Sequence, residues 1–397
     1  MILLSAMRRL LILASAMVFF DVVFFSAIAP LLPTYVSDLG LSKAEAGVLS
    51  ASYAAGTLAF SLPAGLLAAR IGPRLTVIGG LLVLGCASVL FGFAHQFLLL
   101  DGARFAQGAA GALIWSGTLT WLIAVSPPDR RGSVIGTALG TAVAGALLGP
   151  ALGALAAEVG TEPVFSGVLV VAVALAVFAA RQPKGESPEP QDMHAVVDTI
   201  LTRPILMGTA FVAIPSVMFG AVEVLAPLRI SDLGGGHALI AGGFIAGAAL
   251  EGILAPVAGR YSDRVGRRTP FAVGLTICVF AILAVAVGAT MGEVMAGVML
   301  ASLGGGICFT PALTMLSELA ESSRLHQGFA AGLSNMAWAA GQVAGGLIGG
   351  SAASVAGNAA PGVAIGALLM VTVAYSLHAL SPPPSVPSPV AVPEGRG

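Results

Sequence analysis

The chain has 397 residues, of which 57% are hydrophobic and 9% are charged, and its mean hydropathy is +0.96. This composition excludes a soluble globular protein of that length, and the net charge of −1 gives no electrostatic basis for binding nucleic acid. The apolar runs are about 20 residues long, which predicts an all-α polytopic membrane protein. The cysteines all lie within apolar runs, so we expect neither a disulfide nor a metal site at Cys86, Cys278 or Cys308.

Twelve spans can be placed along the chain, and all but one of the loops between them are short. Residues 181–203 are polar and contain proline, so they predict a cytoplasmic linker between an N-terminal six-helix bundle, 1–180, and a C-terminal six-helix bundle, 204–380. The tail at 381–397 is rich in Pro, Ser and Val, which predicts disorder. The predicted spans are 9–36, 44–68, 75–95, 97–124, 133–157, 164–180, 204–230, 238–259, 269–289, 293–317, 327–352 and 359–380.

The positions of the basic residues predict the orientation of these spans. When both termini are placed in the cytoplasm, fifteen of the eighteen Lys and Arg residues lie on the cytoplasmic side. Cytoplasmic loops carry an excess of Lys and Arg, so the opposite orientation is strongly disfavoured. We therefore expect a multi-pass protein of the cell (inner) membrane with both termini in the cytoplasm.

The first span holds an acid near its middle. At a rise of about 1.5 Å per residue, Asp21 lies roughly 16 Å from Leu10, near the centre of a hydrocarbon core about 30 Å thick. A carboxyl group there is costly unless it faces a cavity, a partner or a proton source, so Asp21 is a candidate for proton coupling or substrate binding. A carboxyl that is merely hydrogen-bonded to a neighbouring helix is the alternative. Pro30 and Pro33 interrupt the backbone hydrogen bonds of the same span and predict a bend.

The fourth span contains a basic residue, Arg104, followed by Gln107 and Gly108. A buried guanidinium group needs acceptors, and Asp101, three residues earlier, can supply one on the same face of the helix. Pairing with a nearby carboxyl group would also make Arg104 sensitive to the protonation of that group. We therefore expect Arg104 to act together with the intramembrane acids.

The fifth span is built around regularly spaced glycines. A glycine face allows close packing against another helix, and the proline predicts a bend because it has no N–H to donate. A generic membrane helix with a small-residue face is the alternative. The residues of this pattern are Gly136, Gly145, Gly149, Pro150 and Gly153.

Two loops repeat one another at a distance of 194 residues. The segments GLLAARIGPR (65–74) and GRYSDRVGRR (259–268) match, as do the Asp-Leu-Gly triplets at 38–40 and 232–234. Two halves in parallel register imply a pseudo-two-fold axis along the membrane normal, with a substrate path between the halves. An acid flanked by arginines at a helix end can latch a neighbouring helix, although the arginines could instead serve only to set the topology. Ala69 replaces the acid in the first copy. The conformational candidates are Gly65, Arg70, Gly72, Arg74, Gly259, Asp263, Arg264, Gly266 and Arg268.

Two further spans carry acids away from the membrane interfaces. Glu223 lies in the seventh span and Glu251 in the eighth. Because burial disfavours the charged form of a carboxyl group, these two acids and Asp21 are candidates to take up and release protons near neutral pH. A hydrogen-bonded acid with a packing role is the alternative.

The eleventh span carries a polar face that is a candidate to line a central cavity. Asn335, Trp338 and Gln342 are spaced by three and four residues, so they share one side of a helix. The amides can bind a substrate and Trp338 can supply an apolar or cation–π wall, although hydrogen bonding between helices is equally open for both amides. Phe24, one of the phenylalanines that flank Asp21, is a further candidate to line the cavity.

These motifs resemble those of the major facilitator superfamily. The loop at 259–268 resembles the signature loop of that family, and the Arg104 motif resembles its buried-arginine motif. The glycine pattern of the fifth span is similar to the signature of its proton-coupled exporters. The resemblance covers residues 9–380 and implies a fold of twelve helices in two pseudo-symmetric six-helix bundles.

A narrower resemblance concerns the vesicular amine transporters and the 12-span drug:proton antiporters near them. Asp21 lies nine residues before Pro30, and Glu223 lies four residues before a proline, as in that group. The chain departs from the amine transporters in spans ten and eleven, where it has Gly306 and Asn335 instead of acids.

The resemblance implies a secondary active transporter that exports amphiphilic or cationic small molecules, such as drugs and amines, in exchange for protons by alternating access. It implies no enzymatic activity and no cofactor besides the proton gradient. The expected partners are the substrate, protons and the lipid bilayer, and we expect a monomer. The chain has no GxxxxGK[ST] motif, so transport must draw on an ion or solute gradient. A proton symporter that imports a small metabolite is the alternative, and a non-transporting membrane sensor is a further one.

Overall fold

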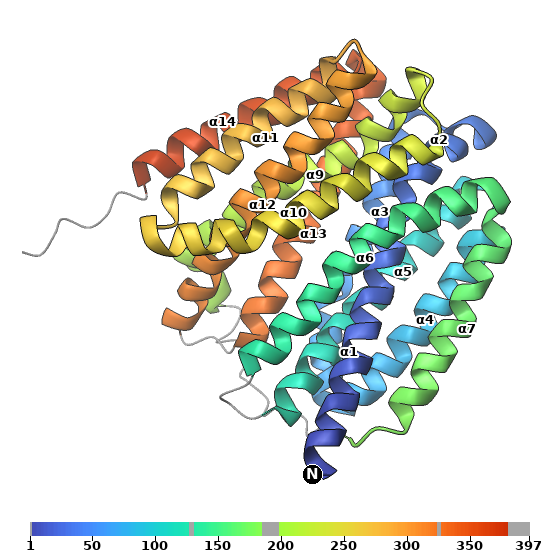
Figure 1. Cartoon of the computed structure of the whole chain (residues 1–397), viewed down its shortest axis with the longest axis vertical. Coiled ribbons are helices and arrows are strands. Elements are labelled where there is room, and N and C mark those ends of the chain that lie inside the picture. Colours follow the sequence, from blue (N-terminus) through green and yellow to red (C-terminus); the bar gives the residue numbers. More distant parts are fainter. Residues whose placement is uncertain (1, 127–130, 185–197, 324–326, 380–397) are drawn as a thin grey trace, which may run out of the picture.

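The computed structural model describes residues 2–126, 131–184, 198–323 and 327–379. Within these ranges the chain forms thirteen helices of twelve residues or more and no strand (Figure 1). The first seven are α1 (Ile2–Ser26), α2 (Ile28–Leu39), α3 (Lys43–Ile71), α4 (Pro73–Phe93), α5 (Phe97–Val125), α6 (Arg131–Val159) and α7 (Thr161–Ala180). The others are α9 (Arg203–Asp232), α10 (His237–Val265), α11 (Arg268–Val287), α12 (Met291–Ser322), α13 (Gln327–Ala356) and α14 (Ala359–Ala379).

Each of the twelve predicted spans corresponds to a helix or, for the first span, to the pair α1 and α2. Among the described residues, eleven helical segments are long and apolar enough to cross a membrane, with α1 and α2 counted together. The helix outside that set is α13, which contains Asn335 and Gln342 and packs mainly against α9 and α3. A helix enclosed by other helices does not need an apolar surface toward lipid. The all-α membrane fold predicted from the sequence is therefore confirmed.

The first span is interrupted between α1 and α2. The helix α1 ends at Ser26, and α2 begins at Ile28 after a single residue. Pro30 lies in the first turn of α2, where a missing N–H leaves no intrahelical hydrogen bond unmade, and Pro33 lies further inside the helix. The interruption leaves the last carbonyl groups of α1 in need of other donors.

The two halves repeat one another in their turns as well as in their sequence. Gly40 and Gly234 end a helix with φ values of 63° and 84°, and Gly72 and Gly266 do so with φ values of 88° and 87°. Both pairs are 194 residues apart. A side chain would be strained at these positive φ values, so the same two turns require glycine in each half.

The packing of helices follows the same repeat. In the first half α3 and α4 pack on α5, α4 packs on α7, and α1 packs on α6. In the second half α10 and α11 pack on α12, α11 packs on α14, and α9 packs on α13. In this repeat α3 corresponds to α10, and α13 corresponds to α6. The contact of α3 with α13 therefore corresponds to the contact of α10 with α6, and these are the two main contacts between the halves. This is the arrangement that a pseudo-two-fold axis produces.

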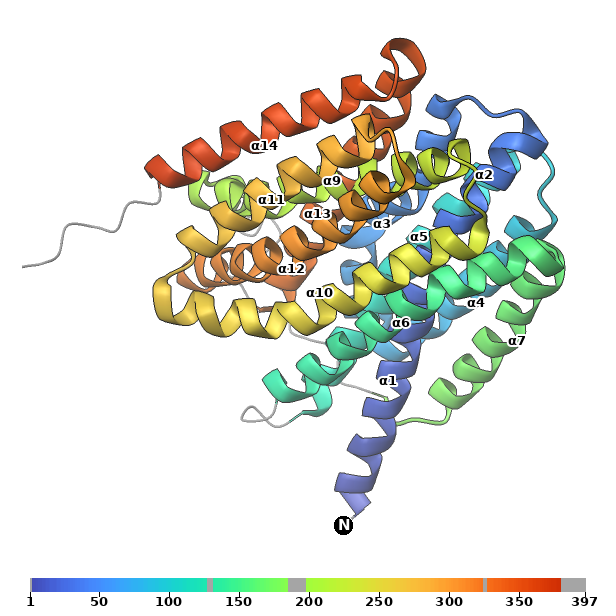
Figure 2. The ribbon, with the colours of Figure 1, turned by 45° about the horizontal axis from the view of Figure 1, so that its top comes forward.

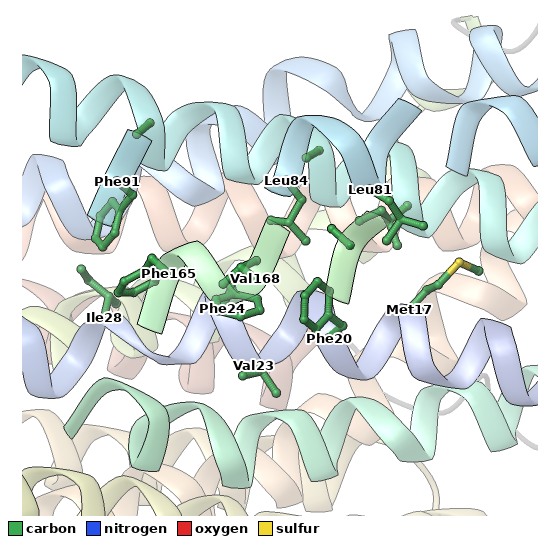
Figure 3. Close-up of a cluster of buried hydrophobic side chains, with 14 of the residues drawn as sticks. Met17, Phe20, Val23, Phe24, Ile28, Leu81, Leu84, Phe91, Phe165 and Val168 are labelled. Carbon is green, nitrogen blue, oxygen red and sulfur yellow. The ribbon is translucent and has the colours of Figure 1, made fainter. Parts of the chain in front are cut away.

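Each half has its own apolar core. Figure 3 shows the first, in which Met17, Phe20 and Phe24 of α1 lie against residues of α4 and α7. A separate cluster fills the second half and is built from α9, α11, α12, α13 and α14. These clusters support the division into two bundles around 181–203, which stays a prediction; residues 185–197 of the linker and the tail at 381–397 lie outside the described residues.

The halves are joined at the end of the molecule opposite to the termini, which we call the far side; the other end is the terminus side. Lys43 Nζ donates a hydrogen bond to Asn358 Oδ1 (2.9 Å) and lies 3.9 Å from a carboxylate oxygen of Asp232. His237 lies 2.9 Å from the hydroxyl of Thr34 and 3.5 Å from a carboxylate oxygen of Glu158. These hydrogen bonds and ion pairs join the two halves at this end.

On the terminus side the two halves diverge. Figures 1 and 2 show the beginning of α1 and the end of α14 pointing away from each other, whereas α6 and α10 run side by side across the middle. The polar contacts on the terminus side stay within one half: Arg74 binds Ala180 and Gln182, and Arg267 binds Asp263 and Glu318. The molecule is therefore closed on the far side.

Close backbone approach between α3 and α5 depends on Gly56 and Gly108. A Cβ atom at Gly56 would lie 2.8 Å from the backbone nitrogen of Ala109, and one at Gly108 would lie 2.6 Å from the carbonyl carbon of Tyr53. Both distances are shorter than a normal van der Waals contact. The two glycines let α3 and α5 approach each other, as small residues do in membrane bundles.

Substitution of Gly56 by Ala is expected to destabilise the protein, because the methyl group meets the backbone of α5. Overpacking of this kind costs about 1–3 kcal/mol. The matched control is Gly79→Ala on α4, where a Cβ atom meets nothing within 4 Å; this change should be neutral or stabilise the helix by up to about 1 kcal/mol. Unfolding of the purified protein by SDS titration measures both variants, and equal unfolding free energies would contradict the packing described here.

Candidate functional site

Asp21 lies in a closed polar cage inside the first half. Its side chain is 2% exposed and accepts two hydrogen bonds, from Tyr53 Oη of α3 (2.7 Å) and from Trp115 Nε1 of α5 (2.9 Å). Gly111 completes the cage, because a Cβ atom there would lie 2.5 Å from Tyr53 Oη and 2.8 Å from Asp21 Oδ1. Two donors aimed at one carboxylate compensate for much of the cost of its burial.

Arg104 binds the interrupted end of α1. Its guanidinium group donates to the carbonyl oxygens of Phe24 (2.7 Å) and Phe25 (2.5 Å), and to Oε1 of Gln107 (3.1 Å). The last carbonyls of a helix lack intrahelical donors, and the negative end of the helix dipole favours a cation. Arg104, which is 1% exposed, therefore replaces the N–H groups that the break removes. Its guanidinium carbon also lies 4.9 Å from the centroid of the Tyr53 ring.

The predicted pairing of Arg104 with Asp101 is wrong. Asp101 instead accepts a hydrogen bond from the hydroxyl group of Ser52 on α3. Residues three apart on a helix are neighbours, but Asp101 turns toward α3, whereas the guanidinium group of Arg104 turns toward the backbone carbonyls of α1. Gln107, which receives the third hydrogen bond, is held in turn by its own donation to Ser88 (3.1 Å).

The glycines of α6 press against the opposite side of α1. A Cβ atom at Gly145 would lie 2.6 Å from the carbonyl oxygen of Phe19, and one at Gly149 would lie 2.5 Å from that of Val23. Gly153 approaches the backbone at the break itself. By contrast, a Cβ atom at Gly136 meets nothing within 4 Å. Pro150 is buried next to this contact, so the glycine face predicted for the fifth span holds α1 against the bundle over three turns.

Glu223 and Glu251 differ from Asp21 in that no donor holds their carboxylates among the described residues. Both side chains are half-buried, and within the described chain neither has a hydrogen-bond or ion-pair partner. Arg104, in the other half of the molecule, attracts Glu223 electrostatically. Glu251 lies against Gly306 of α12, where a Cβ atom would approach its Cγ to 3.5 Å.

Aromatic rings connect the two halves. Phe25 of α1 lies 5.1 Å, between ring centroids, from Tyr53 of its own half and also 5.1 Å from Trp338 of α13. Phe24, which we expected to line the cavity, is instead 3% exposed and packs 6.1 Å from Phe165 in the core of the first half. One residue along α1 is a rotation of about 100°, which explains why Phe25 faces the other half in its place.

The amides of α13 occupy two different environments. Asn335 is half-buried and makes no hydrogen bond among the described residues. Gln342 is 7% exposed, and its side-chain oxygen lacks a donor. A Cβ atom at Gly220 of α9 would lie 2.9 Å from that oxygen, so Gln342 sits where α13 meets α9.

The repeated loops bind within their own halves. Asp263 accepts a hydrogen bond from Arg267, which also donates to Glu318 of α12 (3.0 Å). The hydrogen bond to Asp263, more than the pairing with Glu318, raises the pKa of Arg267. In the first half Arg74 donates to the carbonyls of Ala180 (3.2 Å) and Gln182 (2.9 Å) at the end of α7. Asp263 thus reaches α12 through Arg267, which was not among the predicted residues.

The other loop candidates make fewer contacts. Arg70, Arg264 and Arg268 have no hydrogen-bond or ion-pair partner among the described residues. A Cβ atom at Gly65 would meet nothing within 4 Å, and one at Gly259 would meet only the methyl group of Thr310, at 3.3 Å. In this state, in which the far side is closed, packing does not require a glycine at either position.

Four residues important to the site were not predicted from the sequence: Tyr53, Trp115, Phe25 and Arg267. Tyr53 and Trp115 hold Asp21 from other helices, so only the three-dimensional packing brings them together. A signal for them does exist, because an intramembrane acid needs donors and an indole or phenol in a neighbouring span can provide one. Nothing in the sequence indicates which span is the neighbour.

The fold and these residues define a polytopic helical transporter made of two pseudo-symmetric halves. The sequence profile of the Major Facilitator Superfamily matches residues 14–286 and 239–395. The chain belongs to this superfamily.

Several known proteins are similar to the chain. It is 32% identical to the MFS-type transporter ppzB of Metarhizium rileyi over 124 residues, which are 30% of the chain and 26% of that transporter. It is 24% identical to the quinolone resistance protein NorA of Staphylococcus aureus over 214 residues, 52% of the chain and 54% of NorA. The aligned segments thus span about a quarter and about half of these relatives. The finer resemblance to vesicular amine transporters stays a prediction.

Two solved structures share the fold. A bacterial homologue of the human lysosomal transporter Spinster, described as inward-facing and unoccupied, has a TM-score of 0.74 at 13% identity and covers 94% of this chain and 96% of its own. The human organic anion transporter MFSD10 (TETRAN) has a TM-score of 0.68 at 15% identity, with coverage of 93% and 99%. At these identities the similarity establishes the fold alone.

Removal of the Tyr53 hydroxyl is expected to destabilise the protein, because it takes one of two donors from the buried Asp21 carboxylate. Tyr53→Phe should lower the free energy of unfolding by about 1–3 kcal/mol. Tyr35 offers a matched control, since its hydroxyl is buried without a hydrogen-bond partner. Tyr35→Phe should therefore leave stability unchanged or raise it slightly. SDS titration compares the two, and a Tyr35→Phe variant as unstable as Tyr53→Phe would refute the cage.

Proposed function

We propose that this transporter is a proton-coupled antiporter that exports amphiphilic cations across the cell membrane. The observation that carries the proposal is the pair of half-buried carboxylates, Glu223 and Glu251, which have no hydrogen-bond or ion-pair partner among the described residues. A partnerless acid inside a membrane protein is a functional group by default, because nothing else compensates for its burial. The relative NorA is a quinolone resistance protein, which is consistent with efflux.

The same site can bind a cation and a proton in alternation. An ionised Glu223 attracts a positively charged substrate, and the rings of Phe25 and Trp338, which meet between the halves, offer apolar and cation–π contact. A proton that binds the same carboxylate removes the attraction and releases the substrate. Because either ligand neutralises the acid, exchange of one for the other follows from the charge alone.

The closed far side supports a defined access state. The excess of Lys and Arg on the terminus side is typical of cytoplasmic loops, so the far side is the outer face in this proposal. Lys43, Asp232, His237 and Glu158 then form an outer gate, and the diverging helices of the terminus side correspond to an inward-facing state. In this state the substrate enters from the cytoplasm.

Within the proposed cycle Asp21 and Arg104 hold the structure rather than carry the proton. Both have their strongest partners within the first half, and those partners leave little room for a ligand. The positive charge of Arg104 acts on Glu223 across the interface between the halves. It favours the ionised form of that acid until a substrate or a proton arrives.

Substitution of Glu223 and Glu251 is expected to abolish exchange. In proteoliposomes with an imposed pH gradient, Glu223→Gln should slow substrate-driven proton movement at least about tenfold, the consequence of losing an interaction with a charged group. Glu251→Gln separates the roles of the two acids. The matched control is Glu162→Gln, a carboxylate exposed at the far side and 3.9 Å from His95, which should transport at the wild-type rate.

The assay uses a panel of lipophilic cations and neutral drugs, and it records the direction of both proton and substrate. Proton movement that is substrate-dependent in wild type and absent in Glu223→Gln supports antiport at this site. Proton and substrate moving in the same direction would establish a symporter instead. Full activity of the double variant Glu223→Gln/Glu251→Gln would refute the proposal.

A further inference from the structure

Gln342 on α13 has a buried oxygen with no donor. The residue is 7% exposed, and its Oε1 accepts no hydrogen bond within the described chain. An amide oxygen buried in this way costs free energy, so its lack of a donor needs an explanation. The question is which donor reaches this oxygen during the transport cycle.

Glu223 is the group placed to supply that donor. Gly220 of α9 faces Gln342 directly, since a Cβ atom there would lie 2.9 Å from Oε1. Glu223 is three residues further along α9, and helix residues three apart have Cβ atoms about 5–6 Å from each other. A glutamate side chain spans that gap. An ionised carboxylate only accepts hydrogen bonds, whereas a protonated one carries an O–H that donates.

We propose that Gln342 is the hydrogen-bond acceptor for the protonated form of Glu223. The inference rests on the proposed function, in which Glu223 exchanges a proton for the substrate. Gln342 is then a positioning residue: it stabilises the protonated carrier and fixes the direction of the Glu223 side chain. In the ionised form the bond is absent, and the carboxylate is available to a cation.

The hydrogen bond would connect proton uptake to the contact between the halves. Gln342 lies one helical turn from Gly346, where a Cβ atom would approach Ala51 of α3 to 3.1 Å, and one turn from Trp338, which contacts Phe25. The same segment of α13 therefore touches α9 on one side and the first half on the other. A bond that forms only on protonation changes how α9 and α13 are held together at this point.

Few charged groups surround Glu223. The described part of α13 has no titratable residue in the membrane interior, and Arg104 of α5 is the group that acts on Glu223 electrostatically. Burial favours the protonated form and Arg104 favours the ionised one, so a specific acceptor shifts the balance further toward protonation. Other titratable groups inside the helices packed against α9 are Tyr35 on α2, Tyr53 on α3, Glu251 on α10, Cys278 on α11, Cys308 on α12 and Tyr375 on α14.

Infrared difference spectroscopy tests the bond without requiring transport. Spectra of the membrane-reconstituted protein between pH 5 and pH 9 contain the C=O band of protonated Glu223, which is assigned by its loss in Glu223→Gln. In Gln342→Met, which has a similar volume and no amide, the midpoint of this band should fall by about half to one pH unit, the equivalent of one hydrogen bond. The band should also move to higher frequency, as for a carboxyl group without an acceptor.

Two further variants separate this role from a packing role. Gln342→Leu also removes the amide but has a different shape. It replaces Gln342→Met if that variant does not fold, and it should give the same downward shift of the midpoint. Gln342→Glu keeps an acceptor and adds a second carboxyl group, so the pair should hold a proton to higher pH. Shifts in opposite directions are not expected from loss of packing. In proteoliposomes the pH profile of exchange should move with the spectroscopic midpoint.

The outcomes are distinct. A Glu223 band with the same midpoint and frequency in wild type and Gln342→Met overturns the inference and leaves the antiporter proposal standing. If Glu223 shows no titration between pH 5 and pH 9, both the inference and the assignment of Glu223 as proton carrier fail. A third outcome is a shifted band in Gln342→Met together with normal substrate-driven exchange in Glu223→Gln. This result retains the hydrogen bond and overturns the antiporter proposal for this acid.

Discussion

The binding of Arg104 to the broken end of α1 is the interaction on which the first half depends. In a bilayer no water is available to satisfy a carbonyl group that has lost its helical partner, so an interrupted helix needs donors from its neighbours. Arg104 supplies them to Phe24 and Phe25. This contact determines where α1 lies relative to α5, and it places Asp21, one turn earlier on α1, within reach of Trp115.

The surroundings of α1 follow from that position. On one side the glycines of α6 bring two backbones together, and on the other the phenylalanine rings of α1 pack against α4 and α7. Asp21 is enclosed between these surfaces with Tyr53 and Trp115 as donors. Packing fixes the hydrogen-bond partners of Asp21, its glycine neighbour and its backbone. Asp21 therefore has little freedom to change its protonation state and its hydrogen-bond partners together.

The sequence predicts the helices and the repeat well because both are local signals. Apolar length identifies the spans, and a constant offset of 194 residues identifies turns that need glycine at a positive φ, as Gly72 and Gly266 show. The partners of a buried group are not local. The sequence pointed to Asp101 as the acceptor for Arg104 and to Phe24 as a cavity residue, and both were wrong because the packing of α1 against other helices decides which acceptors Arg104 reaches and which ring faces the other half.

The two halves differ in the surroundings of their intramembrane charges. In the first half each intramembrane charge has hydrogen-bond partners: Asp21 has two donors and Arg104 has three acceptors. Such groups are costly to disturb, since breaking one bond leaves a buried charge uncompensated. In the second half Glu223 and Glu251 have none among the described residues, so protonating them breaks no bond. In the antiport cycle proposed above, the field of Arg104 acts on a carboxylate that no hydrogen bond among the described residues holds, so a proton changes the state of one half without breaking the hydrogen bonds of the other.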